Sequence, residues 1–267
     1  MLSVIVITKN EAHRITRCLS SVQWADEIIV LDSGSTDKTV EIAKSYTPHV
    51  FVNTDWQGYG IQKQRVLMRA TGQWVLHLDA DEWVDDKLKS NILRIIKANP
   101  LDIDACRVPI RLCFYGKPLR FSSSPTRHLR LFKREGAKFS DDLVHEKIIL
   151  PEGARIKQLK TPIYHDSFLD VSHAIQKMDK YSSYSAQIRI NQNKRPAGFT
   201  RSFGAAFWMF FRCYLLQRGF LDGKAGLMLA ILNAQGSFYR GIKQIYLDKA
   251  IRDSRDLKDA QKLQQSV

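Results

Sequence analysis

The sequence predicts an α/β protein with a mostly parallel sheet between helices, followed by a helical C-terminal region. Over the first 100 residues, short β-branched segments alternate with segments of helical periodicity. That alternation is typical of parallel sheets covered by helices on both faces. From residue 171 onward the periodicity is helical, and the stretch 199–246 is strongly apolar.

Four strands and four helices are expected in residues 1–100. The strands are 2–7, 27–31, 49–53 and 73–78, and the helices are 11–23, 39–46, 61–70 and 86–98. Three of the strands end in polar loops, at 8–11, 32–37 and 79–82. Because the carboxyl ends of parallel strands meet at one edge of a sheet, we expect these loops to form a ligand site there.

The loop 79–82 carries three acids, Asp79, Asp81 and Glu82, at the end of an apolar strand. Their mutual repulsion favours a cationic partner, and a divalent metal carrying phosphates is the obvious candidate. The alternative is an acidic turn that begins the next helix. No G-x-G-x-x-G follows the first strand and no G-x-x-x-x-G-K-[ST] occurs, which argues against dinucleotide and P-loop sites.

The 267 residues carry a net charge of +14, and the whole excess lies beyond residue 100. Residues 1–100 hold 12 basic and 12 acidic side chains, whereas residues 101–267 hold 29 and 15. A basic surface attracts nucleic acid, anionic lipid or a phosphorylated substrate; a basic surface without a specific partner is the alternative. No nucleic acid is expected as a partner, because the sequence has no helix-turn-helix, zinc or RNP signature.

The spacing of the cysteines and the length of the apolar runs indicate the cellular compartment of the protein. The four cysteines are scattered without a C-x-x-C pair, which indicates reduced thiols and neither a disulfide framework nor a zinc site. The apolar start of the chain is too short for a secretory segment. The longest uncharged run, 225–239, falls below the roughly 18 residues of a spanning helix. The sequence therefore predicts a cytoplasmic protein without a transmembrane helix.

The second part of the chain continues the sheet and then becomes helical. Strands are expected at 106–112 and 129–132, and 151–163 has the pattern of a short basic hairpin. A turn-rich loop at 116–125 is placed to reach an acceptor. Helices are expected at 171–190, around 207–216 and at 225–245, with a break at 219–223. The polar tail after Asp248 is expected to fray.

The apolar helices of 199–246 are accompanied almost entirely by cations. The basic residues are Arg201, Arg212, Arg218, Lys224, Arg240 and Lys243. Aromatic and basic side chains together suit peripheral binding to an anionic membrane surface. A helical hairpin packed on the sheet domain and a dimer interface are the alternatives.

Three motifs stand at the strand ends: SVIVITKNE at 3–11, VLDSGSTDKT at 30–39 and LDADE at 78–82. In order and spacing they resemble family 2 glycosyltransferases of the GT-A fold. VHE at 144–146, YHDSF at 164–168 and LDGKAG at 221–226 extend a similarity to bacterial lipopolysaccharide inner-core β-1,4-glucosyltransferases. Gln64 departs from that pattern, because such proteins often have Asn there.

The resemblance implies a nucleotide-sugar donor, UDP-glucose, at the predicted edge. Asp32 would accept a hydrogen bond from the base, and Asp79 would face the ribose or diphosphate. A cationic patch around His128 suits the donor diphosphate or an acceptor phosphate. The expected donor-binding residues are Thr8, Asn10, Glu11, Asp32, Ser35, Lys63, Asp79, Arg127 and Arg130. On turn statistics alone, Asp32 is a turn-forming residue.

The resemblance also implies a metal and a general base. Asp81 would bind Mg²⁺ or Mn²⁺, and His165 would complete the metal shell, which favours Mn²⁺ because Mg²⁺ prefers oxygen ligands. A partly buried histidine bonded to backbone is the alternative for His165. Glu146 is the expected base on the acceptor hydroxyl; Asp141 and Asp142 are the next candidates, and a surface acid paired with a nearby cation is the alternative.

The implied enzyme is a metal-dependent inverting glycosyltransferase that adds glucose from UDP-glucose to a lipopolysaccharide core heptose. Three regions are expected: 1–100 binds the nucleotide sugar, 101–170 binds the acceptor, and 171–267 is helical. The implied location is the inner face of the inner membrane. A glycosyltransferase acting on a polyprenyl phosphate or another cell-envelope glycan is the alternative enzyme, and a basic nucleic-acid-binding protein is the alternative of another class.

Overall fold

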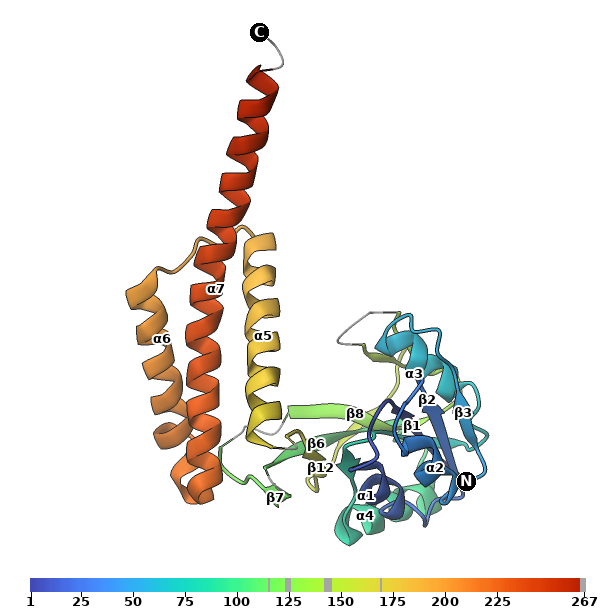
Figure 1. The fold of residues 1–267 in the computed structure, drawn as a ribbon. Helices are drawn as coiled ribbons and strands as arrows, with labels where there is room; N and C mark the ends of the chain where they lie inside the picture. Colours follow the sequence, from blue (N-terminus) through green and yellow to red (C-terminus); the bar gives the residue numbers. More distant parts are fainter. Residues whose placement is uncertain (115, 123–125, 142–145, 169, 265–267) are drawn as a thin grey trace. The chain divides into compact units, whose positions relative to one another are not determined.

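The structure is a computed structural model and describes residues 1–114, 116–122, 126–141, 146–168 and 170–264 (Figure 1). The chain forms two compact units. The sheet unit comprises Met1–Pro118 and Pro125–Ser167, and the helical unit comprises Leu119–Ser124 and Phe168–Val267. Residues 1–100 and the following segment up to 167 thus share one unit, and most of the loop 116–125 belongs with the C-terminal helices.

The sheet unit alternates strands and helices over its first hundred residues. Its strands are β1 (Leu2–Thr8), β2 (Glu27–Asp32), β3 (Val50–Val52), β4 (Trp74–Asp79) and β5 (Glu82–Trp83). Its helices are α1 (Ile15–Ser20), α2 (Thr39–Lys44), α3 (Tyr59–Leu67) and α4 (Asp86–Ala98). The predicted alternation is confirmed. Helix α1 begins later than expected because the backbone N–H groups of Glu11 and Ala12 donate to Thr39 and Asp37 side chains.

Seven further strands complete the sheet unit. They are β6 (Ala105–Phe114), β7 (Lys117–Pro118), β8 (Thr126–Lys133), β9 (Lys138–Phe139), β10 (Ile148–Ile149), β11 (Ile156–Gln158) and β12 (Ile163–Asp166). Within the described residues the main sheet runs β3-β2-β1-β4-β8-β6-β12-β5, with β7 and β11 paired to β6. Strands β3 to β4 in this order are parallel, whereas β8 is antiparallel to both of its neighbours.

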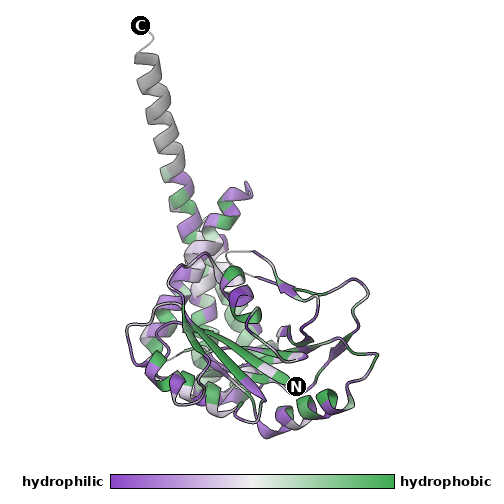
Figure 2. Cartoon of the chain, turned by 90° about the vertical axis from the view of Figure 1, so that its right-hand side faces the viewer, coloured by the Kyte–Doolittle hydropathy of each residue, from purple (hydrophilic) through white to green (hydrophobic). Residues whose placement is uncertain are grey.

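Both faces of the sheet are buried. Helices α1 and α4 pack with Val4, Leu76 and Leu131 in one hydrophobic core. Helix α3 packs on the other face with Ile5, Val75 and Phe132. Figure 1 shows α3 on one side of the strands and α1 and α4 on the other, and the central strands are almost continuously hydrophobic in Figure 2. Burial on both faces explains why β1 and β4 read as apolar runs without polar alternation.

The loop after β4 crosses from the centre of the sheet to its edge strand β5. Strand β5 follows β4 after two residues, yet it pairs with β12, with Tyr164 opposite Trp83 and His165 opposite Glu82. The Asp166 N–H also donates to the Asp81 carbonyl at 2.9 Å. The acidic loop 79–82 is therefore held at β4 on one side and at β12 on the other, which fixes the direction of its carboxylates.

Strand β8 contains a bulge at Arg130. Cys106 of β6 pairs with Leu131 and the next residue, Arg107, pairs with Leu129, so Arg130 has no partner. The extra residue changes the alternation: Leu131 lies in one core, whereas Leu129 packs against the other. A bulge re-aims its side chain, and here it lets the Arg130 side chain turn inward between Leu129 and Leu131.

Two expectations for the chain beyond residue 150 are wrong. Residues 151–163 form no hairpin, because β11 pairs in parallel with β6 from Ile156 opposite Ala105. Asp104 fixes this edge by accepting hydrogen bonds from the Arg155 N–H and the Lys133 ammonium. The tail after Asp248 continues as helix to Gln264, since it is rich in strong helix formers and contains neither Gly nor Pro.

The helical unit contains α5 (Val171–Asn191), α6 (Phe199–Phe211) and α7 (Gly223–Gln264). A π-helical segment, Arg212–Leu216, and a 3₁₀ turn, Gly219–Asp222, connect α6 to α7. The Asp222 carboxylate accepts hydrogen bonds from three consecutive N–H groups of residues 120–122 and from the Ser122 hydroxyl. Among the described residues, no helix is long and apolar enough to cross a membrane.

Candidate active site

The first two polar loops meet at the carboxyl edge of the sheet. Asn10 adopts a left-handed conformation at φ 56° and donates its backbone N–H to Ser35 Oγ at 2.8 Å. Its Oδ1 accepts from the Thr36 N–H at 2.8 Å. Asn tolerates this conformation better than most residues. The loops 8–11 and 32–37 are thereby joined, as expected from the parallel strands.

Asp32 is buried, and its carboxylate is hydrogen-bonded within its own loop. Its carboxylate accepts hydrogen bonds from the N–H groups of Gly34 at 2.9 Å and Ser35 at 2.8 Å, and from the Ser35 hydroxyl. Gly34 has φ +88°, a conformation natural only for glycine. The geometry thus gives Asp32 a turn-forming role, and its predicted contact with a nucleotide base stays a prediction. The Thr8 hydroxyl beside it is buried without a hydrogen-bond partner in the described part of the chain.

Asp79 lies between two cations at the end of β4. Its Oδ1 is 3.0 Å from Lys63 Nζ, and its Oδ2 accepts from Arg130 Nη2 at 3.0 Å. Burial alone would raise the pKa of the Asp79 carboxyl, but the Lys63 ammonium and the Arg130 guanidinium hold that pKa well below its usual range. The carboxylate is therefore charged and fixed in direction before any ligand binds.

The Arg130 guanidinium ties the acidic loop to β4. Besides Asp79 it donates to Glu82 Oε1 at 2.6 Å and contacts His77 Nδ1 at 2.7 Å. Glu82 Oε2 in turn accepts the Asp79 N–H at 3.0 Å. Burial raises the pKa of Glu82 to about 7 in spite of the guanidinium, and burial lowers the pKa of His77 well below its usual range. This network is closed to solvent, because Arg130, Glu82 and His77 are all buried.

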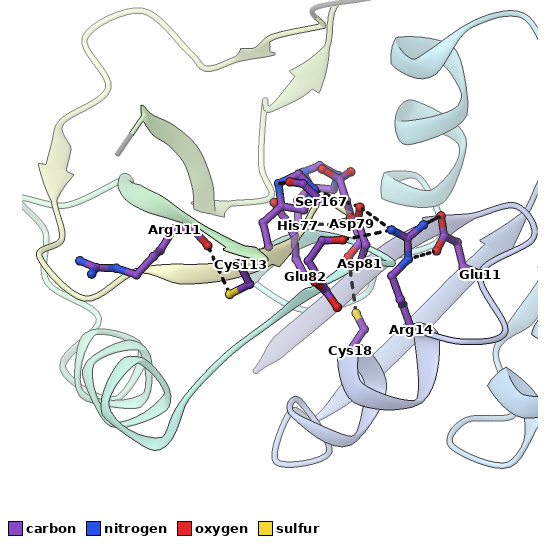
Figure 3. A network of polar contacts seen from close by, with 12 residues as sticks. Glu11, Arg14, Cys18, His77, Asp79, Asp81, Glu82, Arg111, Cys113 and Ser167 are labelled. Carbon is purple, nitrogen blue, oxygen red and sulfur yellow. Dashed lines mark hydrogen bonds and ion pairs between the residues drawn. The ribbon is translucent and has the colours of Figure 1, made fainter. Parts of the chain in front are cut away.

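Asp81 points to the opposite side, toward β12. Its Oδ2 lies 3.0 Å from His165 Nε2 and 3.7 Å from Arg14 Nη1. The other His165 nitrogen, Nδ1, lies 3.1 Å from the Ser167 hydroxyl. Burial opposes charging of His165, yet the Asp81 carboxylate raises the pKa of the imidazole above its ordinary value. Figure 3 shows Arg14 between Asp81 and Glu11.

Arg14 links the first loop to the acidic loop. Its guanidinium makes a two-point ion pair with Glu11, at 2.6 and 2.7 Å, and donates to the Asp166 carbonyl at 3.0 Å. Glu11, a predicted donor-binding residue, is thus held beside Asp81. The loops 8–11 and 79–82 and strand β12 thus share one group of charged side chains: Glu11, Arg14, Asp81 and His165.

Lys63 connects this group to the predicted base. Its ammonium lies 2.6 Å from Glu146 Oε1 and 3.0 Å from Asp79 Oδ1. Burial alone would lower the pKa of Lys63, but the Asp79 carboxylate raises it, so the ammonium keeps its proton. Glu146 thus lies at the same edge as the acidic loop. Asp141 is exposed, and Asp142 and His145 lie outside the described residues.

The two arginines of the predicted cationic patch on β8 differ in exposure. Arg127 is exposed, whereas Arg130 is buried and turned toward Asp79 and Glu82. The bulge at Arg130 causes this difference. Of the pair, Arg127 alone faces solvent. Arg130 instead positions the Asp79 and Glu82 carboxylates. Gln64, where the motif departs, accepts the Phe139 N–H at 2.8 Å and so fixes β9 to α3.

The residues at Asp81 fit a divalent metal held together with a phosphate ligand. Within the described residues, no group of three or more His, Cys, Asp and Glu side chains is arranged to hold a metal by itself. Asp81 and His165 do form an adjacent oxygen and nitrogen pair 3.0 Å apart. Mg²⁺ and similar ions usually take one or two protein ligands and complete their shell with phosphates and water. Asp81 supplies one such carboxylate, and the His165 imidazole lies beside it.

Sequence reasoning assigned no role to three residues of this group: Arg14, His77 and Glu82. Glu82 was visible as the third acid of the loop, but its burial depends on β5 pairing with β12. Arg14 follows Glu11 by three residues, a spacing that allows an ion pair at a helix start. His77 gave no signal, since a histidine inside an apolar strand is indistinguishable from an ordinary core residue.

Comparisons with known proteins agree on one family. The model described as "Glycosyl transferase family 2" matches residues 3–168. The lipopolysaccharide core biosynthesis glycosyltransferase LpsC of Rhizobium meliloti is 30% identical over 266 residues, covering 97% of each chain. An uncharacterized glycosyltransferase of Rickettsia prowazekii is 30% identical over 250 residues, covering 90% of this chain and 85% of its own.

A solved structure shows a similar fold. The mannosyltransferase PcManGT from Pyrobaculum calidifontis, in complex with GDP-Man and Mn²⁺, matches with a TM-score of 0.51 and 15% identity. The match covers 92% of this chain and 87% of that protein. At this identity the likeness concerns the fold.

Proposed function

Because the chain belongs to glycosyltransferase family 2 and has the GT-A fold, we propose that the charged group at the sheet edge carries out an inverting sugar transfer. The proposed donor is UDP-glucose, and the proposed acceptor is a heptose of the lipopolysaccharide core. The name of the Rhizobium meliloti relative supports the acceptor class. The donor rests on the motif resemblance at 3–11, 30–39 and 78–82.

The observation that carries the proposal is a pair of ion-pair groups on the acidic loop: Asp79 lies with Glu146 at Lys63, and Asp81 lies at Arg14. Lys63 bridges Asp79 and Glu146 at 3.0 and 2.6 Å, and Arg14 lies 3.7 Å from Asp81. Such a constellation combines fixed carboxylates with cations at one edge. Sugar transfer from a nucleotide needs both: a base for the acceptor and positive charge near the departing diphosphate.

In the proposed reaction the acceptor hydroxyl oxygen attacks the anomeric carbon, and the bond from that carbon to the diphosphate oxygen breaks. Glu146 takes the hydroxyl proton, and the nucleoside diphosphate leaves with the bonding electron pair from the opposite face. The configuration at the anomeric carbon is therefore inverted. The ion pair with Lys63 holds the Glu146 carboxylate in place at 2.6 Å.

Asp81 and His165 would hold the divalent metal, Mg²⁺ or Mn²⁺, that this fold implies. When bound, the metal stabilises negative charge on the leaving diphosphate as a Lewis acid. Ser167 orients the imidazole through Nδ1, which leaves Nε2 directed at Asp81. Exposed Arg127 is the proposed contact for a phosphate oxygen, because Arg130 on the same strand is held by Asp79 and Glu82.

The loops 8–11 and 32–37 are the proposed pocket for the base and ribose. Thr8 brings a buried hydroxyl without a partner in the described residues. Asn10 and Ser35 lock the two loops together at 2.8 Å. A rigid pocket loses little entropy on binding. The acceptor would be met at the cytoplasmic face of the inner membrane, where a lipid-linked core is presented.

A donor screen followed by product analysis tests this function. The protein is incubated with UDP-glucose, UDP-galactose, UDP-N-acetylglucosamine and GDP-mannose, each with Mg²⁺ or Mn²⁺, and nucleoside diphosphate release is measured. The expected result is fastest release from UDP-glucose, accelerated by a heptose-containing core acceptor, with the opposite anomeric configuration in the product by NMR. Preference for GDP-mannose would contradict the donor, and a retained configuration would contradict the mechanism.

A further inference from the structure

Helix α6 packs small side chains against α7 and leaves several large apolar side chains exposed. Its inner side carries small residues: Ser202 is buried, and Ala206 is half-buried. Opposite Ser202, α7 has Gly241, where an added Cβ would lie 2.8 Å from Ser202 Cβ. The two helices therefore approach closely through small side chains at this point, although Phe199 at the start of α6 still packs edge-to-face on Phe238 of α7.

The large side chains of this segment project outward instead. Phe199, Phe203 and Phe207 recur every fourth residue and so share one face. Eight large apolar side chains of 199–221 are 46–67% exposed: Phe199, Phe203, Phe207, Trp208, Leu215, Leu216, Phe220 and Leu221. Several large apolar side chains left exposed in one segment mark a candidate interaction site in a folded protein. We refer to these eight side chains as the aromatic face.

The charged side chains within and next to the segment of the aromatic face are mostly basic. Arg201, Arg212, Arg218 and Lys224 are exposed. The single acid between residues 199 and 224 is Asp222, and its carboxylate is taken up by the backbone of residues 120–122. Four exposed cations against the one Asp222 carboxylate leave the segment 199–224 with a net positive charge.

From this we propose that the aromatic face binds the surface of an anionic phospholipid bilayer. Aromatic side chains enter the headgroup region while Arg and Lys contact the anionic headgroups. No described helix is apolar enough to span the bilayer, so the binding is to the surface. A second copy of the chain fits less well, because a twofold interface brings two patches of the same positive charge together.

This surface goes beyond the proposed sugar transfer and does not depend on it. The test uses neither donor nor acceptor, so a failure of vesicle binding and a failure of transfer are separate results. Full-length protein is sedimented with vesicles of phosphatidylcholine alone or with about 30% phosphatidylglycerol, over a salt series. The expected result is binding to the anionic vesicles only, weakened by salt because the cations are screened.

Variants locate the binding on α6. F203S/F207S is expected to weaken partitioning about tenfold or more, and R201S and R212S about fivefold each at low salt. Y181S/Y184S is the matched control, since Tyr181 and Tyr184 are similarly exposed on α5; it should bind as the unaltered protein does. Because all of these side chains are exposed, the variants are expected to fold, and circular dichroism checks this.

Trp208 supplies a direct probe of insertion. Vesicles with brominated acyl chains should quench the protein's fluorescence, and W208F should lose that quenching. The proposal is overturned if the protein sediments equally with both vesicle types or with neither. It is also overturned if F203S/F207S and Y181S/Y184S lose vesicle binding equally, or if W208F is quenched as strongly as the unaltered protein. Dimers in sedimentation velocity that F203S/F207S abolishes, without vesicle binding, would assign the face to a second copy instead.

Discussion

Replacing Arg130 by methionine should destabilise the sheet unit strongly and in a pH-dependent way. The guanidinium holds two carboxylates: Glu82, which is buried, at 2.6 Å, and Asp79, whose side chain is 34% exposed, at 3.0 Å. Removing one partner of a buried ion pair leaves uncompensated charge and costs roughly 3–5 kcal/mol of unfolding free energy. Methionine fills much of the same space, so the loss measures charge more than packing.

The pH dependence follows from Glu82. Its folded-state pKa is raised from 4.5 to about 7, so between these values the folded state binds the proton more readily than the unfolded state. Stability therefore falls as pH rises through that window. Without Arg130 the pKa of Glu82 rises further and the window extends above pH 7. The cost of R130M should thus be smaller at pH 6 than at pH 8, by about 1 kcal/mol or more.

Urea denaturation at pH 6 and pH 8, followed by tryptophan fluorescence, measures both effects. Four of the five tryptophans lie in the sheet unit, so the signal reports mainly on that unit. R127M is the matched control: Arg127 lies on the same strand but is exposed, and its loss should cost less than about 0.5 kcal/mol. The reasoning is refuted if R130M costs no more than R127M at pH 8, or if its cost is the same at both pH values.

Two further predictions concern the base and the helical unit. E146Q should keep donor binding and lose turnover by roughly 10² or more, because the amide cannot accept the proton; if D141N shows this kinetic profile and E146Q does not, the base is Asp141. G226A should lower the thermal unfolding midpoint, because its Cβ would overlap the Gly219 carbonyl oxygen. G204A should leave the midpoint unchanged or raise it slightly, because nothing lies within 4 Å of the added Cβ. Equal midpoints for the two variants would show that the backbone near Gly226 moves aside at no cost in stability.

The fold was largely predictable because each element carried a local pattern. β1 and β4 are continuous apolar runs buried on both faces, and the polar residues after them mark the edge where ligands are expected. The convergence of loops 8–11 and 32–37 follows from parallel strands alone. These are properties that a sequence expresses over a few neighbouring residues.

The arrangement of the site depended on partners that the sequence does not reveal. Arg130 turns inward because of a bulge, which exists only relative to β6. Glu82 becomes buried because β5 pairs with β12, about 80 residues later in the chain. The end of α7 was missed for another reason: a polar composition suggested fraying, although helix propensity favoured continuation to Gln264.

The central claim is that the acidic loop, through Asp81, serves a metal-dependent sugar transfer, and the turnover of D81N tests it most directly. UDP-glucose turnover with a heptose-containing acceptor is measured for D81N and for the control D86N at saturating Mg²⁺ and Mn²⁺; Asp86 is exposed in the first turn of α4. We expect D81N to lose most of its turnover while its thermal unfolding midpoint stays close to that of D86N, because an amide supplies no charge to a metal. Near-normal turnover of D81N with either metal would contradict the claim.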